Sequence, residues 1–185
     1  MHAAAGRHHR LGRLGVGREL EAPDLAALVD AARVLLHHDA DAHCLVFPAD
    51  HVIPDEDRFR SAMRAGAAVV KQRGGLLTFG VAPTRPETGY GYLELGSEVF
   101  SVDEWRVHTL DRFIEKPDRE TAEDYVTDGG FLWNSGMFAW RAIDLLAEVR
   151  RQLPLLFDGI GVIGDALGTP GQTEILEEIY PHLPR

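Results

Sequence analysis

Apolar side chains recur along the chain at two spacings, one typical of helices and one of buried strands. Over residues 23–37 and 57–71 they fall three or four positions apart, which predicts two amphipathic helices. Residues 44–47 and 76–81 are short, continuous apolar runs, which predict buried strands. Because the second helix lies between the two runs, this order predicts a parallel sheet with a right-handed crossover.

The second half of the chain predicts five further elements. Strand-like alternation or an apolar run marks 92–113 and 131–140, the latter with a bend, and helical spacing marks 121–126, 143–153 and 172–180. We expect Trp133, Met137 and Phe138 to be core residues, because so dense an apolar segment must be buried. Replacing Trp133 by alanine would then cost roughly 3–5 kcal/mol of stability.

The N-terminal part of the chain differs from the rest. Residues 1–19 are rich in Gly, Arg and His and lack periodicity, which predicts a disordered arm. Their glycine-rich stretch at 12–17 matches no phosphate-binding fingerprint, and we assign it no ligand. The remaining residues, 20–185, are 166 of the 185 in the chain, the size of one domain.

Charge and composition exclude several classes of protein. A formal net charge of −10 argues against a nucleic-acid-binding protein, since phosphate-backbone affinity depends on Lys and Arg. No apolar run reaches the length of about 18 residues that a membrane span requires. The one cysteine, Cys44, excludes an internal disulfide and favours a buried thiol in a cytoplasmic protein.

Candidate metal chemistry begins directly after the first apolar run. Asp50 follows a predicted strand, where open α/β sheets bind ligands, and a carboxylate there suits Mg²⁺. An aspartate that caps the next turn is an equally good interpretation. The His- and Asp-rich run at 37–43 resembles a metal cluster, but polar residues that end a helix and begin a strand explain it better.

Two glycines and two tyrosines alternate over residues 89–92. Glycine lets a main chain approach a ligand, and an aromatic ring can cover the apolar side of a sugar, which makes Gly89 and Tyr90 candidates for a sugar site. A tight turn with Tyr92 in the core would give the same pattern.

An acid and a base follow the strand that ends near residue 114. Glu115 could accept hydrogen bonds from sugar hydroxyls while Lys116 meets a phosphate, although a surface ion pair before Pro117 is the simpler interpretation of these residues alone. Asn134 lies inside an apolar run. A buried amide without a partner costs about 1–3 kcal/mol, so either the fold or a ligand must satisfy it.

Four segments, in order, together resemble one family. LVFPADHVI, LTFGVAPTRPETGYGYLE, FIEKPD and YVTDGGFLWNSGMFAWRA are similar to segments of bacterial mannose-1-phosphate guanylyltransferases, including the bifunctional forms with an isomerase domain. The resemblance spans about 45–154. It implies an incomplete Rossmann-like nucleotidyltransferase α/β fold over 20–185, with a mainly parallel sheet flanked by helices.

The resemblance also implies a reaction and a role for each candidate residue. In that family the sugar phosphate attacks the α-phosphorus of GTP, pyrophosphate leaves, and Mg²⁺ steadies the charge; catalysis is mainly positioning and electrostatics. It implies GTP and mannose 1-phosphate as substrates and allows a homo-oligomer. Asp50 would bind the metal and Lys116 the phosphate, both as catalytic residues. Four residues would contact the mannose: Gly89, Tyr90, Glu115 and Asn134.

The chain departs from the family pattern at both ends. Nothing before Pro23 matches the family's Gly-rich triphosphate loop, and the late Trp-x-Asp-x-Gly segment would lie beyond Arg185. We therefore expect the 185-residue chain to form little GDP-mannose. The alternative is a non-catalytic module that binds a sugar phosphate or serves as an interaction partner.

Overall fold

The structure, a computed structural model, describes residues 2–5 and 22–184, with side chains from Ala26 onward. The described chain forms two compact units, one of residues 2–5 and 45–140 and the other of residues 22–44 and 141–184. The single domain predicted over 20–185 stays a prediction; the described residues form a strand-rich unit and a helical unit. None of the described helices is long and apolar enough to cross a membrane.

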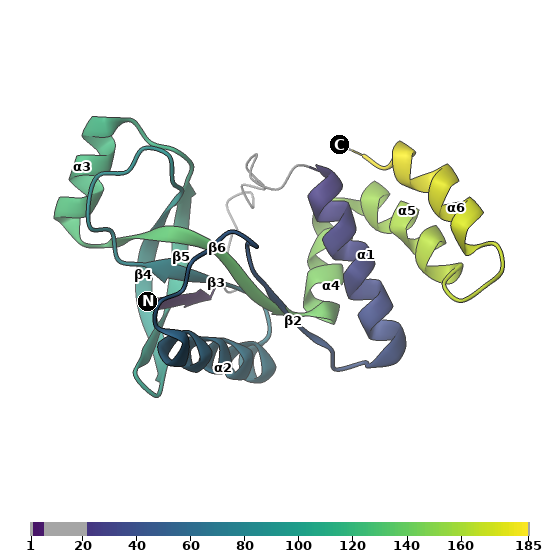
Figure 1. Cartoon of the computed structure of the whole chain (residues 1–185), viewed down its shortest axis with the longest axis horizontal. Coiled ribbons are helices and arrows are strands. Elements are labelled where there is room, and N and C mark those ends of the chain that lie inside the picture. The colour runs from purple at the N-terminus through teal and green to yellow at the C-terminus, as the bar shows by residue number, and fades with distance from the viewer. Residues whose placement is uncertain (1, 6–21, 185) are drawn as a thin grey trace. The chain divides into compact units, whose positions relative to one another are not determined.

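Six strands of the described residues form one sheet, in the order β2-β6-β3-β1-β5-β4, with β6 also pairing with β4 (Figure 1). Their bounds are β1 His2–Ala5, β2 His43–Val46, β3 Leu76–Val81, β4 Tyr92–Val102, β5 Trp105–Ile114 and β6 Phe131–Arg141. The strands predicted at 44–47, 76–81 and 131–140 are confirmed. The segment predicted as continuous over 92–113 is a hairpin instead, with Asp103 in the left-handed conformation at its turn (φ 50°).

The expected mainly parallel sheet is wrong. Strands β1 and β5 pair in parallel, but the pairs β1–β3, β3–β6, β4–β5 and β4–β6 are antiparallel. The predicted strand–helix–strand unit is present as β2, α2 (Glu56–Arg73) and β3. However, β6 lies between β2 and β3, so these two strands are not neighbours. Pairing between segments so distant in sequence leaves no local signal of strand direction.

The first described residues also differ from expectation. Residues 2–5, predicted as part of an arm, form β1 between β3 and β5, where main-chain hydrogen bonds to both neighbours hold a strand without any side-chain pattern. The rest of the predicted arm and the glycine-rich stretch at 12–17 lie outside the described residues.

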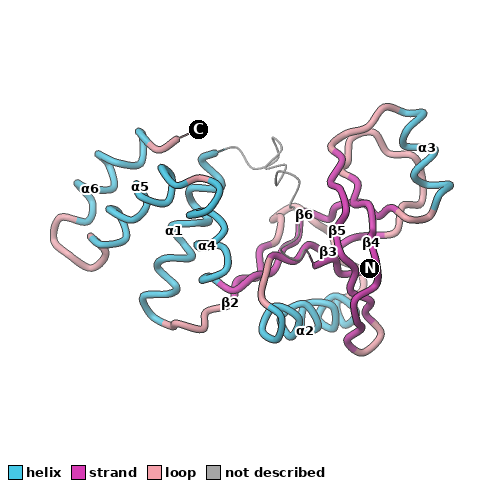
Figure 2. Tube along the Cα trace, turned by 180° about the vertical axis from the view of Figure 1, so that it is seen from behind, coloured by secondary structure: helices cyan, strands magenta, loops and turns pink. Residues whose placement is uncertain are grey.

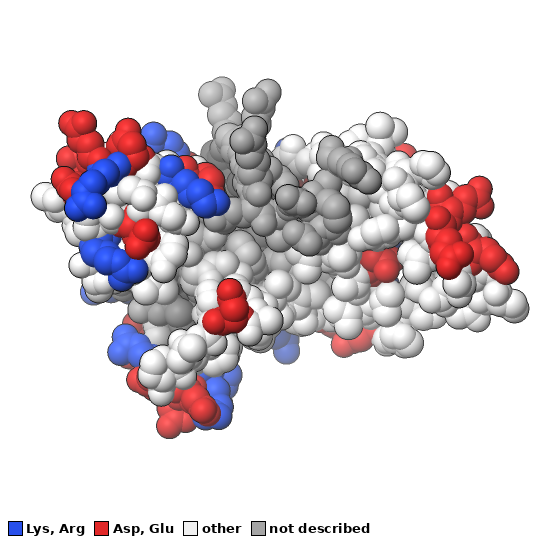
Figure 3. All heavy atoms as spheres, turned by 45° about the horizontal axis from the view of Figure 1, so that its top comes forward, with Lys and Arg blue, Asp and Glu red and all other residues white. Residues whose placement is uncertain are grey.

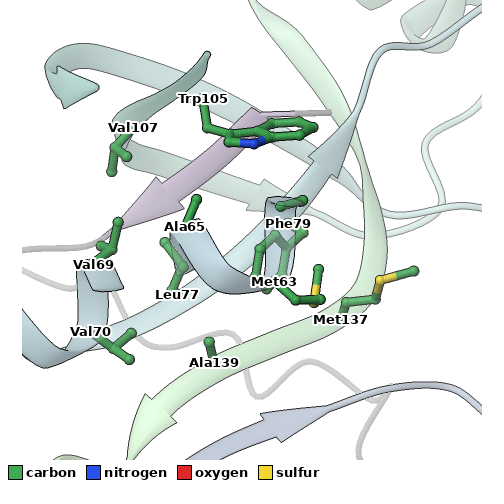
Figure 4. Packing of buried hydrophobic residues seen from close by; sticks show 11 residues of the cluster. Met63, Ala65, Val69, Val70, Leu77, Phe79, Trp105, Val107, Met137 and Ala139 are labelled. Atoms are coloured by element: carbon green, nitrogen blue, oxygen red, sulfur yellow. The ribbon is translucent and has the colours of Figure 1, made fainter. Parts of the chain in front are cut away.

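Helix α2 packs its apolar face on one side of the sheet (Figure 4). Asp55 caps its start by accepting a hydrogen bond from the Arg58 N–H (2.9 Å), and Gly74 ends it. The buried cluster consists of Ala62, Met63, Ala65, Val69 and Val70 from the helix and Leu77, Phe79, Trp105, Val107, Met137 and Ala139 from the strands. This core fixes β3 and β6, which position the candidate site.

A second cluster lies under α3 (Arg119–Asp128), where the Tyr125 ring stacks on Phe131 at 4.0 Å. Trp133 and Met137 are buried, as predicted. Phe138 is only half-buried, because neighbouring strand residues face opposite sides and Met137 and Ala139 take the core side.

The helical unit contains α1 (Ala22–His38), α4 (Ala142–Gln152), α5 (Pro154–Asp165) and α6 (Gln172–Ile179), followed by the 3-10 turn Tyr180–His182 (Figure 2). The sequence predicted three of these helices and missed α5, which begins at Pro154. The core of the helical unit includes the buried residues Val29, Leu145, Val149, Leu156, Ile160 and Ile163. The run at 37–43 ends α1 and begins β2, as expected, and Cys44 is half-buried.

Candidate functional site

All six candidate residues lie in the strand-rich unit, five of them in loops that follow strands and Asn134 within β6 itself. Asp50 lies in the exposed loop after β2. That loop approaches the bend of β6, because a Cβ built on Gly136 would lie only 3.1 Å from Pro48 Cγ. Gly136 has a left-handed backbone (φ 67°), so glycine suits this bend on both grounds. The bend therefore brings the loop of Asp50 toward the strand of Asn134.

Asn134 is tied into the fold on two sides. Its N–H donates to the Gly91 carbonyl (2.8 Å), which joins β6 to the end of the Gly-Tyr loop. Its side-chain Oδ1 accepts from Thr78 Oγ1 (3.0 Å) and from the Gly136 N–H (3.3 Å). The fold thus satisfies the amide oxygen, and these bonds fix the orientation of the whole amide group.

Gly91 lies directly against Glu115. A Cβ at position 91 would approach Phe113 Cζ to 2.8 Å and Glu115 Oε2 to 3.2 Å, closer than a side chain can normally pack. Only glycine lets the loop before β4 run this close to the strand end that carries Glu115.

Glu115 and Lys116 are more than a surface ion pair. Lys116 Nζ lies 2.6 Å from Glu115 Oε1, and the Glu115 side chain is 24% exposed against 57% for Lys116. Glu115 Oε2 is buried and accepts no hydrogen bond from the residues that the structure describes. An acceptor in that position is costly unless a donor reaches it, so it is suited to a ligand hydroxyl.

The backbone at Lys116 is strained. Its φ of 43° is left-handed, an uncommon conformation for a long side chain. Two residues later, Asp118 caps α3 by accepting from the Thr121 N–H (2.8 Å), and this bond holds the pKa of the Asp118 carboxyl below its usual range. The helix start and the strand end thus hold the strained residue between them, a feature often found at binding sites.

Tyr90 and Tyr92 have different roles. Tyr92 is fully buried, and its hydroxyl accepts from the Glu87 N–H (3.0 Å), as in a tight turn closed on a core residue. Tyr90 is 43% exposed and meets Trp133 edge to face, with ring centroids 5.3 Å apart. Gly89 is exposed, and its N–H donates to Glu87 Oε1 (3.3 Å). The phenol ring of Tyr90 is therefore an exposed aromatic surface fixed to the core.

Contacts thus link Tyr90, Asn134, Glu115 and Lys116 through Trp133 and Gly91. Asp50 joins the group only through Pro48 in its own loop, and the shared cleft stays a prediction. No three His, Cys, Asp or Glu side chains in the described part of the chain are grouped to hold a metal. Sequence reasoning missed Arg85 and Glu87, although their spacing within PTRPETGYG was visible.

The surface charge fits a small-molecule site better than a polyanion-binding face. On the face drawn in Figure 3, Lys and Arg side chains lie among Asp and Glu side chains over the left part, and the cluster at the right is of Asp and Glu alone. Exposed arginines also pair with carboxylates of the strand-rich unit, as Arg112 does with Glu94 and Arg119 with Glu123.

Comparisons with known proteins give one consistent result. The model of the nucleotidyl transferase family matches residues 11–160. The chain is 42% identical over 132 residues to the xanthan biosynthesis protein XanB of Xanthomonas campestris pv. campestris (strain B100), covering 71% of this chain and 27% of that protein. It is 43% identical over 120 residues to a mannose-1-phosphate guanylyltransferase of Escherichia coli (strain K12), covering 65% and 25%.

Two solved structures are also similar. A protein described as a mannose-1-phosphate geranyltransferase, from Thermus thermophilus, superposes with a TM-score of 0.73 at 29% identity, covering 86% of this chain and 43% of that one. A mannose-6-phosphate isomerase from Helicobacter pylori gives a TM-score of 0.61 at 29% identity, covering 76% and 50%. The chain thus spans about a quarter of the length of the curated relatives and at most half of these structures.

Proposed function

Since the chain belongs to the nucleotidyl transferase family, we propose that it takes part in guanylyl transfer from GTP to mannose 1-phosphate and that its strand-rich unit holds the sugar phosphate. In this reaction a phosphate oxygen of mannose 1-phosphate attacks the α-phosphorus of GTP. The bond from that phosphorus to the bridging oxygen breaks, and pyrophosphate leaves. The products are GDP-mannose and pyrophosphate.

The buried carboxylate of Glu115 is the observation that supports this proposal best. Its Oε2 lacks a donor among the described residues, and a sugar hydroxyl is a donor of suitable size. The neighbouring Lys116 ammonium would meet the phosphate on the same substrate. Exposed Tyr90 would cover an apolar face of the sugar ring, beside Gly89, and Asn134 would contribute the other end of its fixed amide.

Asp50 would supply one ligand to a divalent metal ion, which we propose to be Mg²⁺. This ion commonly takes only one or two protein carboxylates and completes its octahedron with water and substrate phosphates. One exposed carboxylate in the loop after β2 is compatible with that mode, and no group of three possible ligands among the described residues suggests an all-protein cage. When bound, the ion would neutralise charge on the phosphates.

Binding of the sugar phosphate tests the proposal directly. Calorimetric titration of the 185-residue chain with mannose 1-phosphate should give saturable binding, and Glu115→Gln should weaken it by about tenfold, since a hydrogen bond to a charged group is worth about 1.5–3 kcal/mol. Glu123→Gln is the matched control, because Glu123 is exposed on α3 and its carboxylate pairs with Arg119. A folded chain that does not bind at millimolar mannose 1-phosphate would contradict the proposal.

Pyrophosphate release then separates transfer from binding alone. With GTP, mannose 1-phosphate and Mg²⁺, release that requires Asp50 would support transfer by the chain itself. Saturable binding without release would instead favour the non-catalytic sugar-phosphate module. We also propose a cytoplasmic location, because a single free thiol suits a reducing compartment.

A further inference from the structure

Two charged residues in the loop between β3 and β4 have no part in the proposed reaction. Arg85 and Glu87 form an ion pair in which Arg85 Nε and Nη2 lie 3.2 and 3.1 Å from Glu87 Oε2. The second oxygen of the same carboxylate accepts from the Gly89 N–H (3.3 Å). Glu87 therefore connects Arg85 to the main chain immediately before Tyr90.

Glu87 is also anchored to the core. Its own N–H donates to the hydroxyl of the fully buried Tyr92 (3.0 Å). The bond from the Gly89 N–H, followed by the Arg85 side chain, holds the pKa of the Glu87 carboxyl below its ordinary value, so the group is charged at neutral pH. One residue thus fixes the loop to the core through its backbone and to the loop tip through its side chain.

Trp133 closes the arrangement from the other side. The Arg85 guanidinium lies over the Trp133 ring, 5.4 Å from its centroid, and the Tyr90 ring meets the same indole at 5.3 Å. Trp133 Nε1 donates no hydrogen bond to the described part of the chain, so packing against its neighbours fixes the indole. The contacts form a closed ring: Arg85 to Glu87, Glu87 to Gly89, Tyr90 to Trp133, and Trp133 back to Arg85.

We propose that Arg85 and Glu87 are positioning residues that hold Tyr90 in place as one wall of the sugar site, without touching the substrate themselves. This role rests on the proposed function, because the position of Tyr90 matters only if a sugar lies against it. An aromatic side chain ordered before binding loses little further entropy when the ligand arrives. An exposed ring without this support would have to be ordered by the sugar, at the cost of affinity.

A double-mutant cycle on mannose 1-phosphate binding tests the role. Tyr90→Ala and Glu87→Ala should each weaken calorimetric affinity by about tenfold, and the double variant should be no weaker than Tyr90→Ala, because Glu87 acts through Tyr90. Glu87→Gln, which keeps an acceptor for the Gly89 N–H, should recover part of the affinity. Glu123→Gln, another carboxylate paired with arginine, is the control and should bind like the wild type.

The ligand-free state gives a second measurement. Near-ultraviolet circular dichroism should lose part of its aromatic signal in Glu87→Ala, as the Tyr90 and Trp133 rings lose their fixed geometry, and keep it in Glu123→Gln. Losses of affinity that multiply in the double variant, or unchanged affinity in Glu87→Ala, would overturn the positioning role alone. Absence of binding by the wild-type chain would overturn the proposed function and this role with it.

Discussion

Lys116 holds a left-handed backbone conformation (φ 43°) that costs a non-glycine residue about 1–2 kcal/mol. Lys116→Gly should therefore give a larger free energy of unfolding than Lys116→Ala, by about 1 kcal/mol, although both variants lose the ammonium group. Urea denaturation measures the difference. The same pair of substitutions at Lys71, in the last turn of α2, should give the opposite order, because alanine is the better helix former. Equal stability of the two Lys116 variants would show that the backbone there is unstrained.

Asp30 on α1 is a carboxylate whose Oδ1 is buried and accepts no hydrogen bond from the described residues. Burial raises the pKa of the Asp30 carboxyl, and attraction to Arg33 only partly offsets this. A raised folded-state pKa favours the protonated form, so stability falls as the pH rises from the ordinary value of 3.8 through the folded-state pKa and is level above it.

Asp30→Asn should therefore be more stable than the wild type at neutral pH, and the gain should vanish at about pH 3, where both forms are neutral. Urea unfolding at the two pH values measures this. Asp165→Asn is the control, because Asp165 is 87% exposed and only 3.8 Å from Arg33, so it should show no such gain. A gain of equal size at both pH values would contradict the account.

At the scale of elements, packing outweighs helix propensity in α2. Gly66 lies where a Cβ would come within 2.4 Å of Phe79 Cζ, in the core cluster. Gly66→Ala should destabilise the protein by about 1–3 kcal/mol despite alanine's better propensity, because the buried ring has little room to move. In α5, a Cβ on Gly161 would meet, among the described residues, the end of the Arg33 side chain at 3.6 Å, an ordinary contact distance. Gly161→Ala should therefore stabilise by roughly 0.5–1 kcal/mol. Thermal or urea denaturation of both variants measures these changes in stability. A stabilising effect of Gly66→Ala would contradict the close packing of Gly66 against Phe79.

The whole molecule should unfold in two steps, one for each unit. All three tryptophans, Trp105, Trp133 and Trp140, lie in the strand-rich unit, whereas four of the six α-helices in the described residues lie in the helical unit. Tryptophan fluorescence and far-ultraviolet circular dichroism should therefore give non-coincident urea transitions. Leu156→Ala, in α5, should shift the dichroism transition more than the fluorescence one, and Val69→Ala, in α2, the reverse. Identical shifts by both probes would mean a single cooperative unit.

The sequence determined the local elements and the chemistry of the candidate residues. Helical spacing predicted α1, α2, α3, α4 and α6, because an amphipathic helix records its buried face in its own residues. The segments that resemble the family contain Glu115, Lys116 and Asn134, whose residue types and positions by themselves suggest a binding site. Helix α5 was not predicted from the sequence, because its apolar residues lie between two predicted helices and leave no clear polar face.

Only the tertiary structure decided which segments meet. Strand order and direction depend on main-chain pairing between distant segments, which leaves no pattern within either strand, so the parallel sheet predicted from β2, α2 and β3 was wrong. Whether Asn134 needed a ligand depended on Thr78, 56 residues away. The sequence alone favoured a surface ion pair at Glu115, whereas in the structure its carboxylate oxygens are buried and Gly91 lies close to them. Burial and contact are properties of the folded chain, and a residue's own neighbours in sequence do not fix them.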